Sequence, residues 1–222
     1  MSLKTAISIS ATASTLVQFL TGVPICSRVR RQGEAGDVSG LPFVMGCVGC
    51  LVWLKYSLMI DDPAMILINS TGLFLQLFFL LFFYSFCLGA KSLSVVRYQV
   101  GGAIIALMSV MVFVDMAGED ESVRLQRLGC IGAMASIGFT AAPLVSLRDV
   151  FRTRSTASLP LPMIAVTFLV MVQWYAYGCL IGDRFVQIPN LVGMIVSGLQ
   201  LLLFIVFPRK KRTTTPFQIQ NA

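Results

Sequence analysis

The sequence predicts an all-α membrane protein with seven transmembrane helices, arranged as two parallel three-helix bundles joined by a linker helix (3+1+3). Three observations predict this fold. Of 222 residues, 56% are hydrophobic and 12% are charged, whereas a soluble domain carries about 25% charged residues. Seven apolar segments are long enough to cross a bilayer. The segments on either side of the fourth one repeat each other in sequence.

A helix needs about 20 mainly apolar residues to cross a bilayer core about 30 Å thick. The first candidate is rich in serine and threonine, but it lacks the basic start, clean apolar core and cleavage site of a signal peptide, so we predict a retained helix. The seven segments that qualify lie near 6–26, 41–60, 65–88, 95–117, 128–150, 160–181 and 186–207.

The basic residues predict the orientation of the chain. Twelve of the 17 lysines and arginines fall on the side that holds the first, third and fifth loops and the C-terminal tail. The side richer in these residues is normally cytosolic. We therefore expect the N-terminus to be extracellular or lumenal and the C-terminus cytosolic. This distribution also argues that the net charge of +7 does not serve a nucleic-acid partner.

An internal repeat divides the chain. We expect a first three-helix repeat at 1–90, a linker helix at 91–120, a second repeat at 121–208 and a cytosolic tail at 209–222. The unpaired fourth span makes both copies enter the membrane from the same side, so the repeat is parallel. Trp53, Tyr56, Asp62, Asn69 and Gly72 recur 121 residues later as Trp174, Tyr177, Asp183, Asn190 and Gly193; Thr21 and Pro24 match Thr140 and Pro143 at 119; Leu41-Pro42 matches Leu161-Pro162 at 120.

The repeated tryptophans and asparagines are the candidate binding residues. At about 1.5 Å per residue, Trp53 and Trp174 lie about 13 Å, and Asn69 and Asn190 about 10 Å, below the turns that hold the repeated aspartates. Tryptophan prefers the membrane interfaces, and a mid-depth asparagine is costly unless it is partnered or faces water. A polar cavity between the units explains both; the alternative is that asparagine joins helices and tryptophan fills space. An indole face suits the C–H face of a sugar, and amides suit its hydroxyls.

Other residues are candidates for the path and its gates. Gly49, one turn before Trp53, either widens the cavity or allows close helix packing. Gln200 either lines the cytosolic half of the path or bonds a neighbouring helix. Tyr56, Tyr177 and Asp183 can close an outer gate by hydrogen bonding, whereas Asp62 either joins them or is a solvated turn residue. Four prolines near the cytosolic ends of spans serve either as hinges of an inner gate or as helix ends: Pro24, Pro42, Pro143 and Pro162.

The chain resembles the SWEET family of sugar transporters, and most closely its animal members. The resemblance covers nearly all of residues 5–210. It implies facilitated, bidirectional diffusion of a sugar, a monosaccharide such as glucose, by alternating access in the plasma membrane or the Golgi, and assembly into homo-oligomers. It also implies that Asn69, Asn190 and Trp174 contact sugar, that the four prolines form the cytosolic hinge set, and that Tyr177 and Asp183 belong to the outer gate. It rests on Pro24, Leu41-Pro42, the Trp53–Asn69 segment, Pro143, Leu161-Pro162, residues 174–178, Pro189-Asn190 and Gln200.

Two other function classes compete with a sugar uniporter. A proton-coupled carrier of amino or organic acids normally shows an ionisable residue at mid-depth. Here Lys55, Asp61, Asp62, Asp115 and Asp183 all lie towards the outer side, and none of them is near the midplane by helix count. A seven-span receptor or scaffold would need no internal duplication. The sequence holds no histidine, nucleophile–base pair, metal cluster or phosphate-binding loop, so we expect no enzyme activity, metal or cofactor. The expected partners are a small sugar and membrane lipid.

Overall fold

The computed structural model describes residues 2–116, 118 and 120–209. Within this part of the chain, seven helical segments are long and apolar enough to cross a membrane, which confirms the predicted number of spans. The protein is therefore an integral multi-pass membrane protein. Except for Arg209, the expected tail lies outside the described residues. The helices are α1 (Leu3–Phe19), α2 (Gly22–Gln32), α3 (Leu41–Met59), α4 (Pro63–Ser85), α5 (Ala90–Asp115), α6 (Glu121–Phe139), α7 (Ala141–Thr153), α8 (Leu161–Ile181) and α9 (Arg184–Val206).

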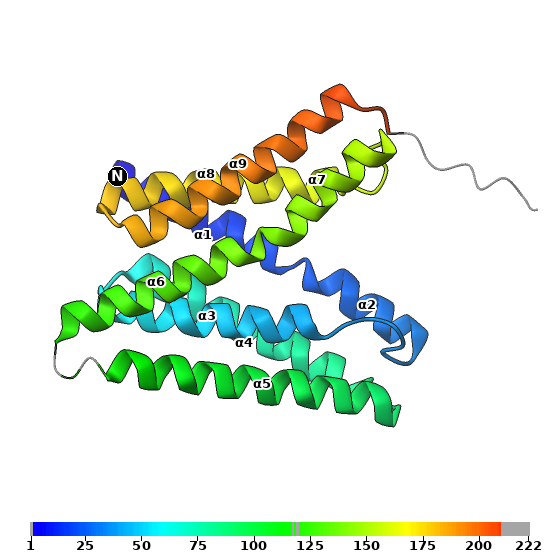
Figure 1. Ribbon diagram of the computed structural model, residues 1–222, viewed down its shortest axis with the longest axis horizontal. Helices are drawn as coiled ribbons and strands as arrows, with labels where there is room; N and C mark the ends of the chain where they lie inside the picture. Colours follow the sequence, from blue (N-terminus) through cyan, green and yellow to red (C-terminus); the bar gives the residue numbers. More distant parts are fainter. Residues whose placement is uncertain (1, 117, 119, 210–222) are drawn as a thin grey trace, which may run out of the picture.

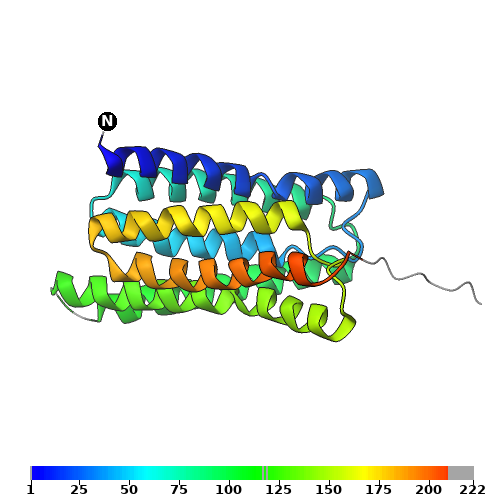
Figure 2. The ribbon, with the colours of Figure 1, turned by 90° about the horizontal axis from the view of Figure 1, so that it is seen from above.

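The helices form two three-helix bundles with α5 between them in the chain (Figure 1). In the first unit α3 packs on α4, and in the second α8 packs on α9. The units meet where α1 packs on α8 and α6 packs on α3, while α5 lies against α3 and α6. Figure 2 shows from above that the helices run roughly parallel to the long axis of the molecule. The predicted 3+1+3 architecture is confirmed.

The first span of each unit is broken in two. Helix α1 ends at Phe19 and α2 begins at Gly22, whereas α6 ends at Phe139 and α7 begins at Ala141. Pro24 and Pro143 each occupy the third position of the second piece, so neither supplies the backbone N–H that would bond to the carbonyl four residues earlier. The two breaks are equivalent in detail, because the hydroxyl of Thr21 donates to the Gln18 carbonyl and that of Thr140 to the Ile137 carbonyl.

The other two predicted hinge prolines do not interrupt a span. Pro42 and Pro162 occupy the second position of α3 and α8. Proline is tolerated in the first turn of a helix, where its missing N–H has no intrahelical partner. These two prolines therefore lie at helix ends, which is the alternative to a hinge that the sequence left open.

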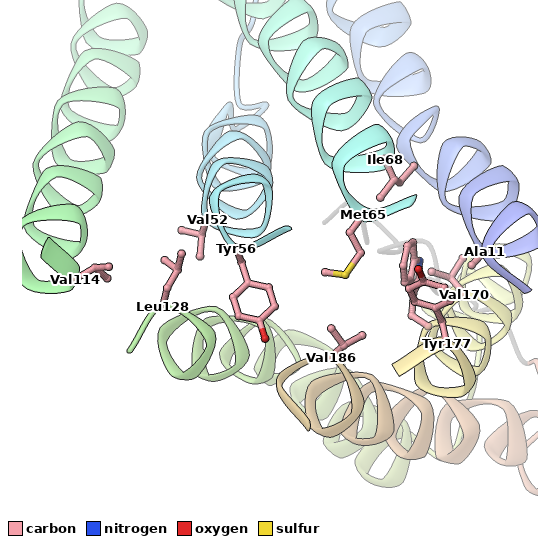
Figure 3. Close-up of a cluster of buried hydrophobic side chains, with 11 residues drawn as sticks. Ala11, Val52, Tyr56, Met65, Ile68, Val114, Leu128, Val170, Tyr177 and Val186 are labelled. Atoms are coloured by element: carbon pink, nitrogen blue, oxygen red, sulfur yellow. The ribbon is translucent and has the colours of Figure 1, made fainter. Parts of the chain in front are cut away.

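Among the described residues, the buried core shared by the two units lies at one end of the molecule. We call the end that holds Asp62 and Asp183 the acidic end, and the opposite end the basic end. Side chains from both units pack together near the acidic end, among them Val52, Tyr56, Leu128 and Tyr177 (Figure 3). Towards the basic end the apolar side chains divide into two clusters. One is formed by α2–α5 and the loops between them, the other by α7–α9 and their loops.

The separate clusters define the conformation of the molecule. Figure 1 shows the units converging at the end where the N-terminus lies and diverging towards α2 and α7. Buried contacts between the units therefore hold the acidic end together, whereas at the basic end the buried apolar side chains of each unit pack within that unit.

Candidate functional site

A cavity of about 200 Å³ lies between the two units, below the acidic end. It brings together all four of the repeated tryptophans and asparagines that the sequence singles out. The lining residues are all uncharged, and the set mixes aromatic, apolar, hydroxyl and amide side chains. They are Thr15, Phe19, Trp53, Met65, Ile68, Asn69, Ser136, Thr140, Met171, Trp174, Val186, Pro189, Asn190 and Gly193.

Each cavity asparagine is anchored to its own helix. The amide nitrogen of Asn69 donates to the Met65 carbonyl at 2.8 Å, and that of Asn190 donates to the Val186 carbonyl at 2.7 Å. This bond uses one of the two N–H groups of each amide, so the second N–H and the oxygen remain available to a solute. The bond also fixes the rotamer of each asparagine, so both amides are oriented before a solute enters the cavity.

Each cavity tryptophan is held by a hydroxyl of the opposite unit. The indole N–H of Trp174 donates to Thr15 Oγ1 at 2.9 Å, and that of Trp53 donates to Ser136 Oγ at 3.2 Å. Both indole nitrogens are thereby satisfied without a solute, which leaves the ring faces free for contact with one. Sequence reasoning missed Thr15 and Ser136. Thr15 and Ser136 are separated by 121 residues, which is the offset of the tryptophan and asparagine pairs. The matches noted in the first spans, such as Pro24 with Pro143, have an offset of 119 and so do not pair these two hydroxyls.

Replacing Thr15 with valine should disturb Trp174 and weaken uptake about fivefold or more. Leaving a buried donor unpaired costs roughly 1–3 kcal/mol. The chain has two tryptophans, so in a Trp53→Phe background fluorescence reports on Trp174 alone. Thr15→Val should shift that emission and Thr15→Ser should restore it. Unchanged emission in Thr15→Val would show that this hydroxyl does not position the indole.

At the acidic end, where the sequence predicts an outer gate, two equivalent hydrogen bonds join the units. The Tyr56 hydroxyl donates to Asp183 Oδ2 at 2.7 Å, and the Tyr177 hydroxyl donates to Asp62 Oδ2 at 2.6 Å. Both tyrosines are buried, and so is Asp62, which is 5% exposed. Asp62 is therefore a buried residue that bonds across the interface, not a solvated turn residue. Its role follows from the repeat that pairs it with Asp183.

Local backbone structure aims both carboxylates at their tyrosines. Asp62 Oδ1 accepts from Met65 N, and Asp183 Oδ1 accepts from Phe185 N, so each aspartate also caps the helix that follows it. The preceding residues, Asp61 and Gly182, both have positive φ angles. Glycine and aspartate are among the residues that adopt this conformation most readily. One oxygen of each aspartate is thus fixed by its own helix and the other is presented across the interface.

The gate touches the cavity through ring contacts. The rings of Trp53 and Tyr56 meet edge to face with centroids 5.5 Å apart, and Trp174 and Tyr177 repeat the arrangement at 5.5 Å. A solute that moves either indole therefore moves a ring that packs against a gate tyrosine.

The remaining candidates lie around this centre. Gly49 is not among the residues that line the cavity, and a Cβ built on it meets no atom within 4 Å. Gln200 is buried in the second unit, where its amide nitrogen donates to the Pro143 carbonyl at 3.4 Å. This bond ties α9 to α7 just beyond the break in the fifth span. Pro24, Pro42 and Pro162 are exposed.

Comparison with known proteins identifies the family. A family model described as "Sugar efflux transporter for intercellular exchange" matches the chain twice, at residues 5–91 and 126–212. The chain is 37% identical over 204 residues to "Sugar transporter SWEET1" of Drosophila pseudoobscura pseudoobscura, covering 91% of this chain and 88% of the relative. It is 37% identical over 218 residues to "Sugar transporter SWEET1" of Caenorhabditis elegans, covering 96% and 68%.

More distant relatives extend the likeness. The rice protein "Bidirectional sugar transporter SWEET2a" (Oryza sativa subsp. japonica) is 30% identical over 203 residues, covering 89% of this chain and 82% of the relative. The solved structure "The 3.7 A resolution structure of a eukaryotic SWEET transporter" is similar to this fold with a TM-score of 0.82 at 23% identity, covering 91% of this chain and 95% of that one. At that identity the structural likeness supports the fold.

Proposed function

We propose that this chain, which belongs to the SWEET family of sugar efflux transporters, is a facilitative, bidirectional uniporter of a monosaccharide such as glucose. The observation that carries the proposal is the uncharged cavity between the units, with paired indoles and amides. Relatives named as sugar transporters make sugar the first candidate among neutral polar solutes. The bulk of Phe19 and Met171 in the lining favours a monosaccharide over a disaccharide.

The cavity can hold a sugar by complementary contacts. The indole faces of Trp53 and Trp174 pack against the C–H face of the ring, and the free amide groups of Asn69 and Asn190 bond its hydroxyls. Because these side chains are already fixed by Ser136, Thr15 and their own helices, little conformational freedom is lost on binding. A site built this way replaces the hydration of the sugar at mid-membrane without a charge.

Transport then follows from two gates that open in turn. In the structure the Tyr–Asp bonds join the units at the acidic end, whereas the buried apolar clusters of the two units are separate at the basic end. For the reverse state, the acidic end opens as these bonds break, and the basic end closes as the pieces after the helix breaks swing together. Pro24 and Pro143, near the breaks, are the hinge residues of this motion.

Orientation and organisation complete the proposal. The acidic end faces the outside or a lumen, and the basic end faces the cytosol, as the distribution of lysine and arginine favours. The repeats extend over 1–90 and 121–208, with 91–120 as linker and 209–222 as the cytosolic tail. The membrane concerned is the plasma membrane or the Golgi, and the chain assembles with copies of itself.

Uptake of labelled sugar by reconstituted protein tests the function. Liposomes containing the protein should equilibrate labelled glucose at the same rate with and without a pH gradient, because no lining residue of the cavity is ionisable. Sucrose and fructose in parallel assays define the substrate range. If acidifying one side drives accumulation above equilibrium, the protein is a proton-coupled carrier and the uniporter proposal is wrong.

A further inference from the structure

The two units meet along two seams that the internal repeat makes equivalent: α1 on α8, and α6 on α3. The bonds Trp174–Thr15 and Trp53–Ser136 set the correspondence between them at 121 residues. The same offset relates Ala11 and Gly132, both of which are buried at their seams. Each residue of one seam therefore has a known counterpart in the other, and the chemistry of the two can be compared position by position.

The α1–α8 seam is joined by polar bonds along much of its length. The amide of Gln173 bridges two serines of α1: its nitrogen donates to Ser10 Oγ at 2.6 Å, and its oxygen accepts from the Ser14 hydroxyl. Nearer the basic end, Gln18 Nε2 donates to Thr167 Oγ1 at 3.0 Å. Ser10, Ser14 and Gln18 are spaced by four residues, so they form one stripe on the helix.

A charged contact continues the seam to the acidic end. The ammonium of Lys4 on α1 lies 5.8 Å from the centre of the Tyr177 ring on α8, within the range of a cation–π contact. The counterpart of Lys4 is Leu125, which lies in the shared apolar cluster with Tyr56. The asymmetry of the two seams therefore reaches the gate itself.

The α6–α3 seam is apolar at the corresponding positions. Among the described residues, Trp53–Ser136 is the side-chain hydrogen bond between these two helices. Gly132 packs closely against α3, because a Cβ built on this glycine would lie 3.4 Å from side-chain atoms of both Val52 and Trp53. The counterparts of Ser10, Ser14 and Gln18 are Ile131, Ala135 and Phe139, and those of Thr167 and Gln173 are Gly46 and Val52.

The two seams differ in what separation would cost. Lipid tails are as apolar as the side chains of the α6–α3 seam, so lipid can replace these contacts at little cost. Separating α1 from α8 would break the bonds of the Gln173 amide to Ser10 and Ser14, and the bond between Gln18 and Thr167. Lipid tails offer these polar groups no replacement hydrogen-bond partner. Ser10 is exposed at the surface of the protein, so its freed hydroxyl would face lipid directly.

We propose that α1 and α8 stay joined throughout the transport cycle, and that the acidic end opens by separation of α6 from α3. The inference rests on the proposed alternating-access function. The break at Leu20–Thr21 permits it, because α2 can remain on α4 while α1, which packs on both α4 and α8, leaves α4 and remains on α8. The moving boundary therefore does not coincide with the boundary between the sequence repeats.

Crosslinking at symmetry-related positions tests the proposal. In a background with the six native cysteines replaced, one variant carries Ser14→Cys and Gln173→Cys, and its counterpart carries Ala135→Cys and Val52→Cys. Both are treated with a short reducible bifunctional thiol reagent. Uptake should stay within about twofold when α1 is crosslinked to α8, and should fall more than tenfold when α6 is crosslinked to α3. Any other pairing of outcomes overturns the proposal, and reduction of the crosslink provides the control.

A second measurement separates this inference from the proposed function. If the unmodified protein carries no sugar, the proposed function fails, and the seams are then judged from distances between spin labels in detergent-solubilised protein. One label pair is Ile9→Cys with Leu180→Cys in the background without native cysteines; its counterpart is Met59→Cys with the native Cys130, in a background where the other five cysteines are replaced. The α1–α8 pair should give one distance population and the α6–α3 pair two. Two populations across α1–α8, or one across α6–α3, would overturn the proposal.

Discussion

Replacing Asn190 with alanine is expected to reduce sugar uptake about five- to 150-fold while leaving the protein folded. The amide of Asn190 lines the cavity and keeps one N–H and its oxygen free for a hydroxyl of the solute. Removing one partner of a hydrogen bond in a site that excludes water costs roughly 1–3 kcal/mol of binding free energy. A cost of 1.4 kcal/mol lowers an equilibrium constant about tenfold. Alanine favours the helix, so α9 itself is preserved.

Initial rates of labelled glucose uptake into liposomes measure this effect, and circular dichroism with size-exclusion chromatography verifies the fold. The repeat supplies a second arm, since Asn69→Ala should cause a loss of the same order. Gln126→Ala is a matched control, because this exposed amide of α6 is not among the cavity residues. Normal uptake in both asparagine variants would mean that the solute does not bind between the units.

Duplication is the reason that so much of the cavity could be predicted. In two parallel copies, a residue that recurs at a constant offset occupies equivalent places about one axis. The gap-free match therefore brought Trp53, Trp174, Asn69 and Asn190 to a common depth before any contact was known. The number of spans was equally accessible, because it depends only on the length of apolar runs.

The contacts that cross between units could not be predicted from one copy of the repeat. Thr15 and Ser136 lie in the outer halves of spans whose inner halves match at a different offset, and the two-residue difference arises near the helix breaks. Asp62 reads as a turn residue until the partner of its second oxygen, Tyr177, is known. Gly49 shares a helix face with Trp53, but whether that glycine borders the cavity depends on packing that spacing does not fix.

Replacing both gate tyrosines with phenylalanine should open the acidic end. Tyr56→Phe and Tyr177→Phe keep the ring contacts with the cavity tryptophans but remove two hydrogen bonds to carboxylates. Each such bond contributes roughly 1.5–3 kcal/mol, and both belong only to the state closed at the acidic end. The pair therefore shifts the equilibrium between the two states by about 10²–10⁴ towards the open acidic end.

The shift can be measured as access to the cavity from the outside. In the background without native cysteines, Ser136→Cys places a thiol in the cavity lining, and a membrane-impermeant reagent added outside reports its exposure. Labelling should accelerate at least tenfold in the double variant and less in each single one, while net uptake falls because the cycle requires both states. Tyr84→Phe is the control: its hydroxyl accepts from Arg97 near the basic end, far from the gate. Labelling of the double variant no faster than that of this control would contradict a gate held closed by the two tyrosine–aspartate bonds.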